Sequence, residues 1–135
     1  MTILLQEHWL YTEHINIFTS DLQNPNIYGM SAMNQNELQR GRPFDGTAIL
    51  CRSDSRCNIT PMETKNDRTS CVRLEIDKVK LLVFNVYMPC GGYGPTSKDK
   101  YDDILFTISS VCDTEENHAL IIGGDFIADI FVLDL

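Results

Sequence analysis

The run Leu81–Met88, "LLVFNVYM", limits how this chain can fold more than any other stretch of the sequence. It is apolar almost without a break, which favours a central β-strand covered on both faces over an edge strand. Pro89 follows and ends the strand, because its nitrogen cannot donate to a sheet. A strand of this kind needs structure packed on each side of it, so a layered fold is expected.

Shorter segments supply the rest of the expected elements. Residues 97–113 place apolar side chains at spacings of three and four, which predicts a helix, and a weaker helical pattern lies near residue 12. The strand, helix, strand order from Leu81 to Asp125 is long enough for a right-handed crossover, although it leaves open whether the two strands are neighbours. We expect further strands, the last of them buried, at residues 2–6, 26–33, 46–53, 71–77 and 119–125.

Length and composition set the outer limits. A chain of 135 residues with 43% apolar content is sufficient for one domain with a core. The net charge of -8 argues against a protein that coats nucleic acid through lysine and arginine, but not against a nuclease that holds a divalent cation with carboxylates. No run is long enough to span a membrane, no signal peptide is evident, and the five cysteines form no CxxC pair. We therefore expect an intracellular protein, nuclear or cytoplasmic, that is not secreted and has no membrane partner.

Two acidic residues and one tyrosine stand where apolar strands end. Glu7 follows the run "ILL", Asp125 follows "ALIIGG", and Tyr87 lies near the end of the central strand. Ligands commonly bind at the carboxyl ends of strands in layered α/β folds. Two carboxylates there suit Mg2+, which uses one or two of them and keeps waters for phosphate oxygens, and a phenol can stabilise developing charge.

Each of these residues also has an ordinary structural interpretation. Glu7 alone is more often a solvated carboxylate, Tyr87 a packing residue with its hydroxyl at water, and Asp125 a turn former after two glycines. The histidines His8, His14 and His118 lack the spacing of a zinc site. The three residues are therefore functional candidates only because of the sequence motifs in which they stand.

Four motifs in order resemble a known family. They are "LLQEHWL" (4–10), "GRPFDGTAIL" (41–50), "FNVYMPC" (84–90) and "IIGGDFIAD" (121–129). Together they are similar to the endonuclease/exonuclease/phosphatase superfamily, which has the DNase I-like fold. Within it, they most resemble the apurinic-type endonuclease domain of non-LTR retrotransposons.

The resemblance implies an α/β fold, a DNase I-like four-layered sandwich, and a hydrolase that nicks DNA with Mg2+, or with Mn2+ as an alternative cation. It assigns Glu7 to the metal, Tyr87 to the phosphate or transition state, and Asp125 to the attacking water. It also implies that residues 1–135 are a partial domain, without the family's first strand and its C-terminal half. We expect the uncovered inner face of a sheet to favour self-association.

Two residues depart from the family pattern. Ile127 replaces an asparagine that helps hold the scissile phosphate, and isoleucine forms no hydrogen bond; losing one such donor typically costs about two to three powers of ten in rate. Asp45 stands where the family usually has glycine. Three hypotheses remain open. The chain is a catalytically dead fragment of an Mg2+-dependent endonuclease, or it is part of a working phosphodiesterase whose missing pieces come from a longer native chain or a partner. The third is a non-catalytic binding or structural remnant of the same scaffold.

Overall fold

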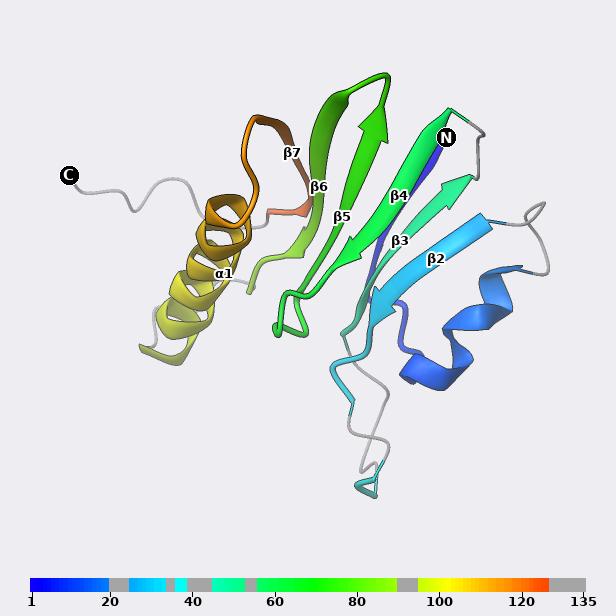
Figure 1. The fold of residues 1–135 in the computed structure, drawn as a ribbon. Helices are drawn as coiled ribbons and strands as arrows, with labels where there is room; N and C mark the ends of the chain where they lie inside the picture. Colours follow the sequence, from blue (N-terminus) through cyan, green and yellow to red (C-terminus); the bar gives the residue numbers. More distant parts are fainter. Residues whose placement is uncertain (20–24, 34–35, 39–44, 53–55, 90–94, 127–135) are drawn as a thin grey trace.

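Two β-sheets form the centre of the computed structural model (Figure 1). The structure describes residues 1–19, 25–33, 36–38, 45–52, 56–89 and 95–126. Within these ranges, no helix has the length and apolar character needed to cross a membrane.

The first sheet has three antiparallel strands in the order β1-β3-β2, and the second has four in the order β4-β5-β6-β7. In the second sheet β4, β5 and β6 are antiparallel, whereas β7 runs parallel to β6. The strand bounds are β1 Thr2–Gln6, β2 Pro25–Met30, β3 Thr47–Arg52, β4 Cys57–Met62, β5 Thr69–Ile76, β6 Val79–Tyr87 and β7 His118–Asp125.

The helix α1, Pro95–Asp113, connects β6 to β7 as the crossover that the sequence predicts. The two strands are neighbours, which answers the question that the sequence leaves open. Ile104, Ile108 and Val111 are the buried residues of α1, and they pack on Phe84 and other residues of the second sheet. Parallel strands need such a crossover because a tight hairpin can join only antiparallel ones.

A second core lies between the two sheets. Ile49 of β3 packs with Val72 of β5 and Val83 of β6. The 3-10 helix η1, Thr12–Thr19, lies against β2, outside the first sheet (Figure 1). The layers are therefore α1, the second sheet, the first sheet and η1, which is the four-layered α/β arrangement predicted. The expectation of a sheet without a partner on its inner face is wrong in this form, because the two sheets cover one another.

Strand β4 was not predicted. Its segment "CNITPM" contains Pro61, which cannot donate a hydrogen bond to a neighbouring strand. The structure places β4 at the edge of the second sheet, paired only with β5, and an edge strand tolerates proline. Proline is excluded from central strands but not from edge strands, so Pro61 conceals this strand when the sequence is read alone.

Strand β7 is a true strand, but the prediction that it is buried is wrong. It forms the other edge of the second sheet, and Leu120, Ile121 and Ile122 keep 45%, 48% and 40% of their exposure. Successive strand residues point to opposite faces, so exposure of three in a row means that neither face of β7 is fully covered. The apolar run of residues 119–122 predicts a buried strand. Burial also requires neighbours on both sides, and among the described residues β7 pairs only with β6.

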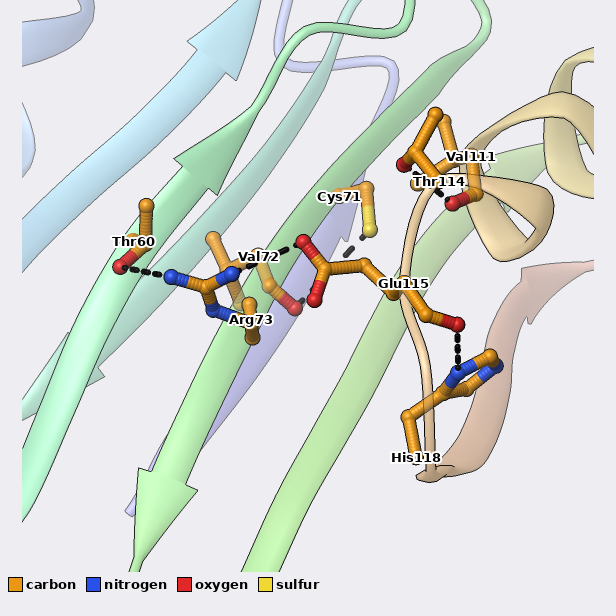
Figure 2. A network of polar contacts seen from close by, with 8 residues as sticks. All are labelled: Thr60, Cys71, Val72, Arg73, Val111, Thr114, Glu115 and His118. Carbon is orange, nitrogen blue, oxygen red and sulfur yellow. Dashed lines mark hydrogen bonds and ion pairs between the residues drawn. The ribbon is translucent and has the colours of Figure 1, made fainter.

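A polar network fastens the turn between α1 and β7 to the second sheet (Figure 2). The Arg73 guanidinium on β5 donates to Glu115 Oε1 at 2.8 Å and to Thr60 Oγ1 of β4 at 3.5 Å. The Glu115 carbonyl accepts a bond from His118 Nδ1 at 3.0 Å. The start of β7 is therefore tied across β6 to the middle of the sheet.

Asn85 of β6 joins the two sheets through hydrogen bonds. Its side chain is fully buried, and its Nδ2 donates to the carbonyl of Leu5 at 2.7 Å and to that of Ala48 at 2.9 Å. Its Oδ1 accepts a bond from Gln6 Nε2. One amide therefore fixes β6 against both β1 and β3, at the end of β1 that leads into Glu7.

Replacing Asn85 with alanine should lower the free energy of unfolding by about 1–3 kcal/mol, because two buried carbonyls and the Gln6 amide lose their partner. Urea denaturation followed by circular dichroism measures this. Asn58→Ala on the exposed side of β4 is the matched control and should change stability by less than about 0.5 kcal/mol. Equal effects of the two substitutions would contradict the joining role of Asn85.

Candidate functional site

The structure brings Glu7 and Tyr87 into direct contact. Tyr87 Oη donates a hydrogen bond to Glu7 Oε1 at 2.8 Å, although the two residues come from different sheets. The tyrosine side chain is buried, with 7% exposure, whereas Glu7 is exposed. The phenol therefore fixes one carboxylate oxygen from the protein side, and the carboxylate stays accessible from solvent.

Asp125 lies beside Tyr87. The two residues are partners in the parallel register of β6 and β7, and the amide of Met88 donates to the Asp125 carbonyl at 2.9 Å. All three residues predicted from the sequence thus gather at one end of the two packed sheets. Their roles in chemistry stay a prediction, but their meeting at one place is an observation.

The two glycines before Asp125 have separate packing reasons. A Cβ on Gly123 would lie 2.4 Å from Leu4 Cδ1 of the first sheet. Gly124 has φ +143°, and a Cβ there would lie 1.9 Å from the Val86 carbonyl oxygen. No L side chain fits at Gly124, because the obstacle there is backbone, whereas at Gly123 the Leu4 side chain would have to move. The double glycine therefore lets β7 lie close to β6 and to Leu4 just before Asp125.

Two residues of the site were not predicted from the sequence as site residues: Arg68 and Asp45. The Arg68 guanidinium lies over the Tyr87 ring, 4.9 Å from its centroid, and Arg68 Nη2 donates to Asp45 Oδ2 at 2.8 Å. The Arg68 carbonyl also accepts the Tyr87 amide at 2.9 Å. Such a cation–π contact gains strength when water is excluded from it, and the Arg68 side chain is only 15% exposed.

One signal for this pair is visible in the sequence: Asp45 stands where the resemblance leads one to expect glycine. No such signal is visible for Arg68, which precedes β5 within a polar turn and has no motif around it. The contact depends on β5 lying next to β6, and only the fold shows that adjacency.

The segment after Glu7 is held by His8. His8 Nδ1 accepts the Leu10 amide at 3.0 Å, so its proton is on Nε2, which donates to the Met30 carbonyl at 3.0 Å. Glu7 and Trp9 on either side have φ of 50° and 56°, in the left-handed region. Both ring nitrogens of the neutral imidazole are therefore used to hold a strained backbone that presents Glu7.

Burial lowers the pKa of His8 below its ordinary value of 6.5, and this exceeds the opposing effect of the hydrogen bonds to the Met30 and Thr47 backbone. The ring also lies against Gly46, where a Cβ would be 2.5 Å from His8 Cε1. The neutral histidine is thus a packing and hydrogen-bonding element. It does not serve as a ligand in this arrangement.

The donor set suits a hard cation held by few ligands. No group of three or more histidine, cysteine, aspartate or glutamate side chains is placed to hold a metal ion among the residues that the structure describes. Glu7 offers an exposed carboxylate, and Asp125 lies across Tyr87 from it. Mg2+ requires no more than one or two carboxylates, so these residues fit it, whereas zinc sites typically use three or four protein ligands. Ile127 lies outside the described residues.

Comparison with solved structures identifies the fold. The chain is similar to the 3′ phosphatase NExo from Neisseria bound to a product DNA hairpin, with TM-score 0.56 and 19% identity over 95% of this chain. A humanized TDP2 from D. rerio matches with TM-score 0.61 and 12% identity over 96% of the chain. The fold is DNase I-like. The human Nocturnin catalytic domain with bound sulfate matches with TM-score 0.54 and 16% identity over 95% of the chain.

The chain spans about half the length of these neighbours, since the matches cover 49%, 53% and 51% of them. The sequence matches no family model and no curated protein. The comparisons thus establish the DNase I-like fold and the matched share. The activity and the substrate of this chain remain matters for proposal.

The lowered pKa of His8 predicts a dependence of stability on pH. The unfolded chain binds this proton more readily than the folded one, so the contribution is complete above about pH 6.5 and is lost as pH falls below it. Urea denaturation between about pH 7.5 and about pH 5 should show a decline that His8→Gln reduces. The exposed His14→Gln is the control and should keep the decline of the parent. An unchanged decline in His8→Gln would refute the assignment.

Proposed function

We propose that this chain carries part of the site of a metal-dependent phosphodiester hydrolase that nicks DNA. The observation that carries the proposal is the Tyr87–Glu7 hydrogen bond, which joins an exposed carboxylate to a phenol beside Asp125. Carboxylates and a phenol gathered in this way suit a cation and a phosphate that react with one another.

In this proposal each residue has one task. Glu7 would hold the cation through its carboxylate, whose Oε1 the Tyr87 hydroxyl keeps in place. Once a cation shares the Glu7 carboxylate, the single phenol proton of Tyr87 would turn from Glu7 to the phosphate. Asp125 orients or deprotonates the attacking water. Mg2+, when bound, supplies the positive charge that offsets the charge of the phosphate.

The choice of DNA as substrate is supported by one neighbour, the Neisseria enzyme, which was solved with a product DNA hairpin. The narrower assignment to an endonuclease of the retrotransposon type rests on the wording of the four sequence motifs. Neither the acidic net charge nor the fold speaks against it, because a bound cation lowers the repulsion between the site and the substrate.

A second candidate function is a binding or structural role without catalysis. Ile127 favours it, because an apolar side chain at the position of a phosphate-holding asparagine removes a hydrogen bond from the transition state. The hydrolase and the non-catalytic role predict different effects of placing an asparagine at position 127.

A nicking assay on supercoiled plasmid with Mg2+ tests the proposed roles. Asp125→Asn should reduce the rate by about two to four powers of ten and Tyr87→Phe by about two to three, because one removes a base and the other a stabilising donor. Glu7→Gln should shift the Mg2+ dependence to higher concentration. Glu116→Gln, an exposed residue in the turn before β7, is the control and should leave the rate unchanged. Nicking that survives all three site substitutions would exclude these roles.

Ile127→Asn separates the two functions. A hydrolase impaired at this position should gain about two to three powers of ten in rate when the donor is restored. If Ile127→Asn brings no gain, the half of the fold that this chain does not span limits catalysis rather than position 127. Calorimetry with Mg2+ then tests the non-catalytic role, because a chain without detectable Mg2+ binding has also lost the cation site.

We further propose that the chain self-associates through β7, with a second copy as the occupant of that edge. The strand carries three consecutive exposed apolar side chains, and a sheet edge offers backbone groups for pairing. The net charge of -8 opposes association, so it should be stronger at high salt, where this repulsion is screened.

Ile121→Lys should weaken this association, because a lysine on an edge strand disfavours pairing with another edge. Sedimentation velocity over a range of concentrations measures the shift towards the 15.4 kDa monomer. Ile17→Lys is the control: Ile17 is 62% exposed and lies on η1, which packs against β2 of the first sheet. A parent that stays monomeric at every concentration and salt would exclude the proposal.

A further inference from the structure

A closed ring of contacts surrounds the site. Glu7 accepts a bond from Tyr87, the Arg68 guanidinium covers the Tyr87 ring, and Arg68 donates to Asp45. The Asp45 carbonyl then accepts the Trp9 amide at 3.2 Å, which returns to the segment beginning at Glu7. Four segments of the chain, at the ends of β1 and β6 and before β3 and β5, therefore hold one another.

The ring contains one guanidinium and two carboxylates, and Asp125 is the register partner of Tyr87 on the neighbouring strand. Such a site repels a phosphodiester unless a positive group is available to it. Within the described residues, Asp45 Oδ2 is the one hydrogen-bond acceptor of the Arg68 guanidinium. Guanidinium has five N–H donors in a planar fork that matches phosphate, so one acceptor leaves most of them for another anion.

The placement of Arg68 supports this use. Its ring contact and its carbonyl bond to the Tyr87 amide keep the guanidinium next to the tyrosine that we propose contacts the phosphate. The Arg68 and Asp45 side chains are mostly buried, with 15% and 19% exposure, so a phosphate would meet the pair at the small part that faces solvent. A substrate phosphate and the Asp45 carboxylate then compete for the Arg68 guanidinium.

We infer that Arg68 receives a phosphate of the bound nucleic-acid strand and that Asp45, by occupying Arg68, sets the affinity for that phosphate. Asp45 is thus an internal anion that weakens substrate binding. The inference rests on the proposed function for its substrate class. It concerns binding, so it can be tested without turnover.

The direct test is fluorescence anisotropy with a fluorescein-labelled DNA duplex of random sequence, in EDTA so that no cleavage occurs. Asp45→Asn removes the charge and keeps a residue that tolerates φ of 53°. We expect several-fold tighter binding, and a slope of log K against log salt that is steeper by about 0.9, the value for one additional phosphate contact. Arg68→Gln in the Asp45→Asn background should abolish both changes.

The matched control is Glu115→Gln. It removes a carboxylate from another arginine pair of the same 2.8 Å length, so it changes the net charge equally, but it lies in the turn between α1 and β7. If Asp45→Asn and Glu115→Gln change affinity and salt slope alike, or if the gain persists without Arg68, the inference is overturned. Asp45→Gly provides a second test if Asp45→Asn does not fold, since glycine also accepts positive φ.

The proposed function and this inference fail separately. A parent chain that nicks plasmid while Asp45→Asn binds no more tightly would remove the inference and leave the function. Tighter binding in Asp45→Asn, lost with Arg68→Gln, would support the inference even where no variant cleaves DNA.

Discussion

The meeting of Glu7 with Tyr87 depends on the Asn85 amide, because it is the point where the two sheets are joined by directed bonds. Apolar packing brings sheets together but has little preference for register, whereas three hydrogen bonds from one buried side chain allow a single alignment. Gln6 is one of its partners, and Glu7 is the next residue. Two residues along β6 from Asn85, Tyr87 points to the same face and meets Glu7. A structural bond inside the core thus determines the geometry at the surface.

The site combines features that oppose one another. Carboxylates are needed to hold a cation, but they repel the phosphate on which the cation acts. The arrangement limits this conflict because Glu7 is exposed and a cation can reach its carboxylate from solvent. The buried phenol of Tyr87 fixes the same carboxylate from the protein side. The Arg68 guanidinium adds positive charge on the protein side, where Asp45 offsets it. The charge of each group at this site is therefore offset by a partner, and replacing one partner leaves the charge of the other unbalanced.

Much of the architecture could be predicted from the sequence, because it depends on local patterns. The apolar run of β6, the spacing in α1 and the motifs around Glu7 and Asp125 correctly placed these elements and indicated where their ends would meet. The failures share one cause, which is dependence on neighbours. Pro61 concealed an edge strand, β7 proved exposed although its sequence resembles a buried strand, and Arg68 acquires its contacts only from the pairing of β5 with β6.

His8 and Gly46 show how closely two distant positions can share one space. The imidazole occupies the volume that a side chain at position 46 would need, and the backbone there has φ of +99°. Neither position can change freely without regard to the other. The φ at position 46 already disfavours any side chain, so the glycine serves both the turn and the imidazole, and two positions thirty-eight apart in the sequence form one packing unit.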